Sequence, residues 1–249
     1  MNQSKAHLPT YVIVVDEISA QRLGYDDPTG LLDRSDVAIV PVPLPERAPT
    51  WQQDLLRRGQ LILDHALIRD PLRHGAYVAP GDADWAIAST KATLFSELCQ
   101  LLGARTISVE MINEKSRRGT LSVSLKAGKP LGPSGEGSVK KETLERLVAG
   151  MALGDDFVGS EPDLAQAKAL LYETGLDGDA TMSRLVRSRA NTGNRIARST
   201  FRVNLSTEAI RTLEVAAKVK VPTFISVGAN IASVVENASE FTATYVVEF

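Results

Sequence analysis

Cysteine and histidine are scarce in this chain of 249 residues, which holds one cysteine, Cys99, and three histidines. A single thiol cannot form a disulfide within the chain, and scattered histidines give no ligand spacing for zinc. Cys99 occupies an apolar position of a helical pattern, which is typical of a buried and inert thiol. The sequence therefore predicts no disulfide, no metal site and no bound cofactor.

Long apolar runs are also missing. No uncharged stretch approaches the ~18 apolar residues that span a bilayer, and the N-terminus lacks the apolar core of a secretory signal. The composition, with 43% hydrophobic and 23% charged residues, is that of a globular protein able to bury a substantial core. Together with the single cysteine, these features lead us to expect a cytoplasmic protein.

Aromatic residues make up only 5% of the chain, and 28 basic residues nearly balance 30 acidic ones. A net charge of −2 gives no general attraction to nucleic acid or to an anionic membrane. Few aromatics also leave few platforms on which bases could stack. Nucleic acid is therefore a disfavoured partner, and any attraction to phosphate must come from a local cluster of charge.

What the sequence does contain is a mixture of short strands and amphipathic helices. Runs rich in β-branched residues predict strands over residues 11–15 and 37–43, and alternating segments at 106–112 and 120–126 predict a β-hairpin. Alternation also predicts a strand over residues 241–249. Helical periodicity and capping patterns predict helices over residues 50–69, 90–102, 139–148, 160–175 and 182–199.

Residues 208–221 are expected to begin as a helix and end as a strand. Because the hairpin requires antiparallel pairing and regular βαβ alternation is missing, the predicted fold class is α+β. The expected architecture is a mixed, largely antiparallel sheet with a central β-hairpin, several amphipathic helices and a β-rich C-terminal tail. We expect a single domain over residues 1–249, with sub-regions at 1–104 and 105–249.

Six arginines, without a lysine or an acidic residue, lie between residues 180 and 207. The planar fork of donors on arginine suits carboxylates and phosphates. If residues 182–199 form one helix, four of these arginines fall within about an 80° arc and Arg189 falls outside it. The predicted basic face, which is the candidate binding site, consists of Arg184, Arg187, Arg195 and Arg198.

Three interpretations of this face remain open. Residues 142–179 hold nine acidic and two basic residues, so they can pair with the arginines inside the chain or, from a second copy, join protomers. The arginines can also bind phosphate groups of nucleic acid or anionic lipid. The leading hypothesis is a non-enzymatic binding or self-assembly protein, whose partner is a second copy of the chain or an acidic protein.

A glycine-rich segment at residues 128–141 lies between a predicted strand and a predicted helix, where backbone N–H groups often hold phosphate. Two of its glycines have the spacing of P-loop glycines, but Ser138 stands where that motif requires lysine. A plain surface loop is the competing interpretation. The alternative function is an enzyme or sensor for a phosphate-bearing ligand or nucleotide, with the candidate residues Lys129, Gly132, Gly135, Gly137, Ser138 and Lys140.

No catalytic residues are identified, since the paired carboxylates along the chain are typical of turns and helix caps and no histidine is placed for a triad. We therefore expect a protein that is not an enzyme. A second alternative comes from the small and hydroxylated residues that alternate after residue 223. This arrangement resembles gasdermin-type pore formers, which implies a β-rich protein that perforates membranes, although a sheet covered on one face explains the same alternation.

Overall fold

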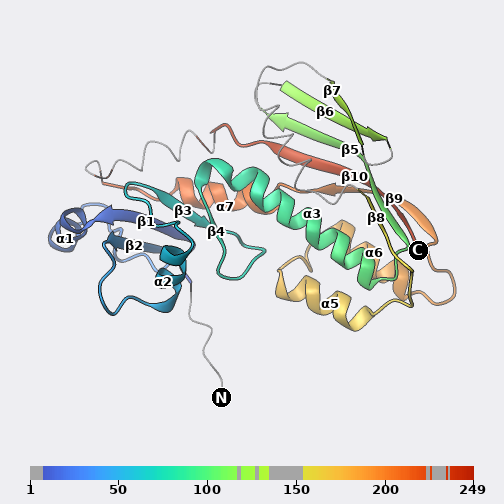
Figure 1. Ribbon diagram of the computed structural model, residues 1–249, viewed down its shortest axis with the longest axis horizontal. Coiled ribbons are helices and arrows are strands. Elements are labelled where there is room, and N and C mark those ends of the chain that lie inside the picture. Colours follow the sequence, from blue (N-terminus) through green and yellow to red (C-terminus); the bar gives the residue numbers. More distant parts are fainter. Residues whose placement is uncertain are drawn as a thin grey trace. The chain divides into compact units, whose positions relative to one another are not determined.

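The computed structural model describes residues 8–116, 119–126, 129–134, 154–222, 225, 234 and 236–249. The chain divides into two compact units. The first comprises Met1–Asp70, His74–Ala83 and Ile210–Asn237, and the second comprises Pro71–Arg73, Asp84–Ala209 and Ala238–Phe249. Each unit contains a mostly antiparallel sheet and helices (Figure 1), so the predicted α+β fold class is confirmed.

The sheet of the first unit has the strand order β2-β1-β3-β4. Its strands are β1 (Tyr11–Asp16), β2 (Val37–Val42), β3 (Ala66–Arg69) and β4 (Tyr77–Val78). β1 and β2 run parallel, and the other pairs are antiparallel. Helix α1 (Glu17–Tyr25) follows β1 directly, because the Asp16 side chain accepts a hydrogen bond from the backbone N–H of Ser19 at 2.6 Å and caps the helix. Both strands predicted in this region are confirmed.

Helix α2 (Thr50–Arg57) contributes to the hydrophobic core of this unit, where Trp51 stacks on Tyr77 with ring centroids 6.3 Å apart. The predicted helix over residues 50–69 is wrong beyond the end of α2. Gly59 adopts a φ of +68°, which ends the helix, and residues 66–69 form strand β3, which pairs with β1. The buried members of the core cluster are Val12, Val14, Val40, Leu55, Leu67 and Tyr77.

The sheet of the second unit has the order β7-β6-β5-β10-β9, with β8 paired to β5. Its strands are β5 (Thr106–Ser116), β6 (Gly119–Lys126), β7 (Lys129–Ser134), β8 (Gly154–Asp156), β9 (Arg198–Asn204) and β10 (Glu240–Glu248). β5 and β6 form the predicted hairpin. β10 confirms the predicted C-terminal strand, and its inward-facing residues Phe241, Ala243, Tyr245 and Val247 are buried.

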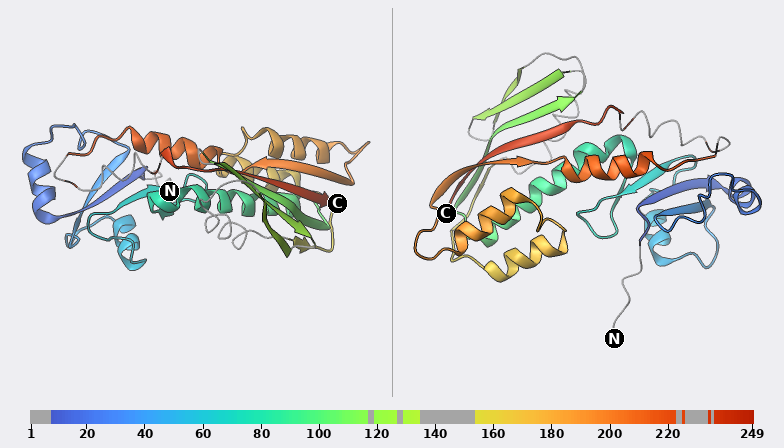
Figure 2. Two further views of the ribbon diagram at one scale, coloured as in Figure 1. Left: turned by 90° about the horizontal axis from the view of Figure 1, so that it is seen from above. Right: turned by 180° about the vertical axis from the view of Figure 1, so that it is seen from behind.

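Helices cover one face of this second sheet (Figure 2). Its helices are α3 (Ala83–Leu101), α5 (Leu164–Glu173) and α6 (Ala180–Ala190). The ring centroid of Phe95 on α3 lies 4.5 Å from that of Tyr245 on β10 and 6.1 Å from that of Phe201 on β9. This aromatic group joins α3 to two neighbouring strands.

Two further helical elements are the short 3-10 helix η1 (Pro80–Asp82) and helix α7 (Thr207–Ala217). The helix predicted at the start of residues 208–221 is confirmed. The strand expected at the end of that segment is wrong for the described residues, since α7 runs to Ala217 and the chain then turns, with Lys218 N–H donating to the Val215 carbonyl at 3.2 Å. The predicted helix over residues 139–148 lies outside the described residues.

Candidate functional site

The arginine-rich segment does not form the single helix that its periodicity predicts. Helix α6 ends at Ala190, and residues 191–197 form no helix before β9 begins. Asn191 is extended, with φ −76° and ψ 98°, and its side-chain oxygen accepts a hydrogen bond from Gly193 N–H at 3.2 Å. This local turn competes with further helical pairing. The predicted helix over residues 182–199 is therefore wrong, and no single helical face carries the four arginines.

The four arginines predicted to bind lie on three different elements. Arg184 and Arg187 are exposed on α6, Arg195 lies in the loop that follows, and Arg198 is the first residue of β9. The structure therefore places only the first two on one helix.

Two of these arginines pair with acidic residues of the same chain. Arg195 forms a hydrogen-bonded ion pair with Glu161, which belongs to the acidic stretch at residues 142–179. The Nη1 atom of Arg198 lies 3.1 Å from a carboxylate oxygen of Glu248 on β10. Pairing within the chain, the first of the three interpretations, thus applies to these two side chains, although only one of the two partners comes from the acidic stretch.

Arg189, which falls outside the predicted basic face, is the buried arginine of the segment, at 6% exposure. Its Nε–H donates to the Leu102 carbonyl at 3.1 Å and its Nη1 donates to the Ile196 carbonyl at 2.9 Å. Its guanidinium lies over the Phe249 ring, 4.2 Å from the centroid. These contacts hold the group in one orientation.

The pKa of Arg189 depends on its burial and on the charges of two neighbouring side chains. Burial lowers the pKa of the Arg189 guanidinium from its ordinary value, the positive charge of Arg195 lowers it further, and Glu161 opposes the change. An arginine remains protonated at neutral pH despite such a shift. Arg189 therefore carries a permanent positive charge close to that of Arg195.

Arg105, Arg189 and Arg195 line a single concavity of about 380 Å³, which we call the arginine pocket. They come from the residue before β5, from α6 and from the loop before β9. The other lining residues are Gly103, Val158, Gly159, Ser160, Glu161, Ile196, Ala197 and Phe249. All of them belong to the second unit, so one compact part of the chain builds the whole pocket.

Gly103 forms part of the pocket wall and also lies in the turn that ends α3. Its φ is +84°, its N–H donates to the Gln100 carbonyl at 2.9 Å, and the N–H of Ala104 donates to the Cys99 carbonyl at 3.0 Å. This is the hydrogen-bond pattern of a helix that closes with a left-handed residue. A Cβ at position 103 would overlap the carbonyl oxygen of Ser160, so the wall requires glycine here.

Only part of the glycine-rich candidate site lies within the described residues. Lys129 and Gly132 lie in strand β7, which pairs with β6, so this portion is not the loop that the sequence predicts. A strand forms there because the chain can continue the hairpin of β5 and β6 by a third antiparallel pairing. The remaining candidates, Gly135, Gly137, Ser138 and Lys140, lie outside the described residues.

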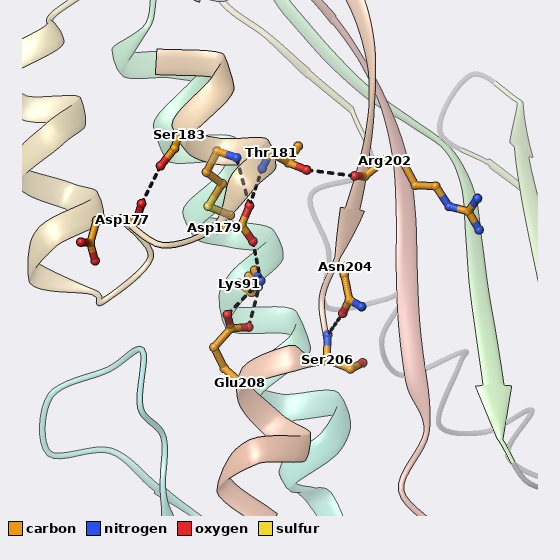
Figure 3. A network of polar contacts seen from close by, with 10 residues as sticks. Lys91, Asp177, Asp179, Thr181, Ser183, Arg202, Asn204, Ser206 and Glu208 are labelled. Carbon is orange, nitrogen blue, oxygen red and sulfur yellow. Dashed lines mark hydrogen bonds and ion pairs between the residues drawn. The ribbon is translucent and has the colours of Figure 1, made fainter. Parts of the chain in front are cut away.

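A second polar cluster centres on Lys91, whose side chain is fully buried (Figure 3). Its Nζ lies 2.8 Å from an oxygen of Asp179 and 2.9 Å from an oxygen of Glu208. The same Asp179 caps α6 by accepting hydrogen bonds from the backbone N–H groups of Thr181 and Met182. One cation therefore fixes the starts of two helices against α3.

Sequence reasoning missed Arg105, Arg189 and Lys91. A signal exists for Lys91, because it is the one basic residue of α3 and lies four residues from both Ile87 and Phe95, which are buried. That spacing puts it on the buried face of the helix. Nothing in the sequence identifies the two arginines, because their convergence depends on contacts between segments more than 80 residues apart, such as the one from Arg189 to Leu102.

Within the described ranges, no group of three or more His, Cys, Asp or Glu side chains is arranged to hold a metal ion. No helix in those same ranges combines the length and apolar character needed to cross a membrane. Comparison with known proteins adds no family, because no family, curated protein or solved structure matches this chain.

Proposed function

We propose that this chain is a non-enzymatic binding protein that recognises an anionic group in the arginine pocket. The observation that carries the proposal is that three arginines, Arg105, Arg189 and Arg195, line one concavity of about 380 Å³. That volume lies in the range typical of pockets for small ligands. The binding function predicted from the arginine segment is thus kept, but the recognising surface is different.

Electrostatics favours an anion at this position. Like charges gathered in one place repel one another, and partial burial strengthens the repulsion because the surroundings screen less than water does. A bound anion removes this cost and accepts charge-assisted hydrogen bonds. Arg189 is already held by two carbonyl groups and the Phe249 ring, so binding needs little further ordering of that side chain.

The lining of the pocket supports binding rather than catalysis. Its polar side chains other than the arginines are those of Ser160 and Glu161, and Glu161 is engaged with Arg195. A nucleophile with an adjacent base would be needed for covalent chemistry, and the described lining residues do not supply that pair. The glycine-rich and pore-forming alternatives gain no supporting observation from the described residues.

Isothermal titration calorimetry with a panel of small carboxylates and phosphates tests the proposal. We expect Arg105→Gln to weaken binding by about tenfold, because it removes one charge-assisted hydrogen bond while its exposed side chain contributes little to folding. Arg187→Gln is the matched control, since it removes the same charge from an exposed position of α6 that does not line the pocket. Equal weakening by both variants would show that overall charge, and not the pocket, attracts the anion.

A further inference from the structure

We propose that the outer edge of strand β9 binds an acidic peptide segment in the extended conformation, which adds to the second sheet as a further strand. No residue of β9 lines the arginine pocket, so this site does not depend on the proposed anion-binding function. The register of β9, the course of α6 beside it and the arginines that border the edge support the site.

The backbone of β9 is bonded on one side only. It is the last strand of the order β7-β6-β5-β10-β9, and its outer edge pairs with no strand among the described residues. The N–H of Phe249 donates to the Ala197 carbonyl at 2.8 Å. Because antiparallel neighbours exchange hydrogen bonds at every second residue, the odd-numbered positions of β9 bond to β10. The N–H and C=O groups of Arg198, Thr200 and Arg202 therefore point outward.

Helix α6 runs along this edge in the direction opposite to β9. Near its start, the hydroxyl of Thr181 donates to the Arg202 carbonyl at 3.4 Å, which agrees with an outward direction for this carbonyl (Figure 3). Near its end, Arg189 donates to the carbonyl of Ile196, two residues before β9, at 2.9 Å. Extended peptides bind proteins by adding to exposed sheet edges, and a peptide added here would have α6 on one side.

Positive charge lies on both sides of the edge. α6 and β9 together contain five arginines and no acidic residue. The Cζ atom of Arg184 lies 6.0 Å from the centroid of the Phe201 ring on β9, and Arg187 follows about one helical turn later, also exposed. The side chain of Arg202 points away from α6 (Figure 3). Arg184, Arg187 and Arg202 form no ion pair with a described residue.

Acidic residues around the edge have cations of their own. Glu248 on β10 pairs with Arg198, whose Nη1 atom lies 3.1 Å from its carboxylate. Glu240, at the other end of β10, lies opposite Lys115 in the register of β10 and β5, and both line one concavity. The carboxylates at the starts of α6 and α7 both contact Lys91. The edge therefore keeps a positive charge that a ligand can neutralise.

An acidic peptide fits this edge better than nucleic acid or a second copy of the chain. The edge presents backbone carbonyls as well as N–H groups, and a peptide strand has partners for both. The phosphate groups of nucleic acid accept hydrogen bonds but donate none. A second copy paired through the same edge would bring arginines of β9 opposite one another, and like charges in that position are destabilising. Acidic side chains on an added strand gain cross-strand ion pairs instead.

Fluorescence anisotropy on the full chain with short labelled probes tests the site. The acidic probe alternates glutamate and threonine, and a second probe has the same sequence with its central backbone nitrogens methylated. A third has lysine in place of glutamate, and the last is an oligouridine. We expect the acidic probe to bind about tenfold or more tightly than each of the others, because it alone has both the charge and the N–H groups. Equal binding of the methylated probe, tighter binding of oligouridine or no binding of the acidic probe would overturn the inference.

Two substitutions at Thr200 locate the binding. Thr200→Pro removes an outward N–H and no bond to β10, a position at which an edge strand tolerates proline. We expect it to weaken binding of the acidic probe about tenfold. Thr200→Val is the matched control, since it keeps the N–H and a β-branched side chain, and its affinity should be unchanged. Unchanged affinity in Thr200→Pro, or equal weakening by both variants, would place the peptide elsewhere.

Arginine variants test the charge of the edge and separate it from the arginine pocket. We expect Arg202→Gln to weaken binding of the acidic probe about threefold to tenfold. Arg211→Gln, at an exposed position of α7, and Arg105→Gln, in the pocket, should leave it unchanged. Weakening by Arg105→Gln alone would show that the pocket binds the carboxylates of the probe, and the inference would be wrong. Circular dichroism confirms that each variant is folded; if Thr200→Pro is not, the methylated probe and Arg202→Gln decide.

Discussion

At the scale of single residues, burial separates arginines that look alike in the sequence. Arg187 and Arg189 are two positions apart on α6, yet the first is exposed and the second is 6% exposed and held by two carbonyl groups. The helical pattern selected the exposed one, because an amphipathic pattern assigns charged residues to solvent. The buried Arg189, in contrast, is held in one orientation by its contacts, and it lines the arginine pocket.

Lys91 is the residue whose loss should most affect stability. Replacing it by methionine leaves the carboxylates of Asp179 and Glu208 without their cation, in a place where the lysine side chain is fully buried. Removing one partner of a buried ion pair costs about 3–5 kcal/mol. We expect a loss of that size in the free energy of unfolding, measured by urea denaturation. Lys168→Met, at an exposed position of α5, should change stability by less than about 0.5 kcal/mol.

A second substitution separates charge from packing at this site. Adding Glu208→Gln to Lys91→Met removes the charge of one of the two carboxylates that have lost the lysine, so part of the lost stability should return. The Asp179 carboxylate is kept because it also caps α6. If the double variant is as unstable as the single one, the loss comes from the shape of the lysine side chain and not from its charge.

At the scale of elements, local sequence patterns predicted several strands and helices correctly. The predictions failed where an element depends on contacts between segments distant in the sequence. β1, β2, the β5–β6 hairpin and β10 follow from alternation or β-branched runs within a few residues. The helix at residues 160–175 is also present as α5, capped by Asp163. Two of the errors lie where a helix was carried through a turn, past Gly59 and past Asn191, into segments that pair as strands. The sequence can keep a helical spacing of apolar residues beyond the point where the backbone turns, because this spacing does not depend on the backbone hydrogen bonds of a helix.

The turn between α3 and β5 links the end of a helix to the wall of the pocket. Gly103→Ala forces a side chain into the left-handed region at φ +84° and against the Ser160 carbonyl. Strain of this kind costs about 1–3 kcal/mol. We expect a lower free energy of unfolding and, because Ser160 must move, weaker anion binding. Gly24→Ala in α1, where a Cβ meets nothing within 4 Å, should instead stabilise by about 0.4–1 kcal/mol and leave binding unchanged. Weaker binding in both variants would show that the loss of binding in Gly103→Ala does not come from the turn at the pocket wall.

At the scale of the whole molecule, charges of the arginine segment are partly satisfied within the chain. Arg195 pairs with Glu161 and Arg198 pairs with Glu248, which leaves Arg184 and Arg187 as the exposed arginines of α6. Self-assembly through the segment stays a prediction of the sequence, now with two arginines on a helix in place of four. An anion bound in the arginine pocket, in contrast, needs no second copy of the chain.

Native mass at low and high salt distinguishes these two arrangements. We expect light scattering to give the mass of one chain, 26.8 kDa, at both salt concentrations, because Arg195 and Arg198 already have acidic partners in the chain. An assembly joined by exposed charge would instead lose mass as salt screens the attraction. Arg187→Glu reverses a charge on α6 without altering the pocket lining. A larger mass that falls both with salt and with this substitution would make α6 a contact between copies, and the single-chain expectation would then be wrong.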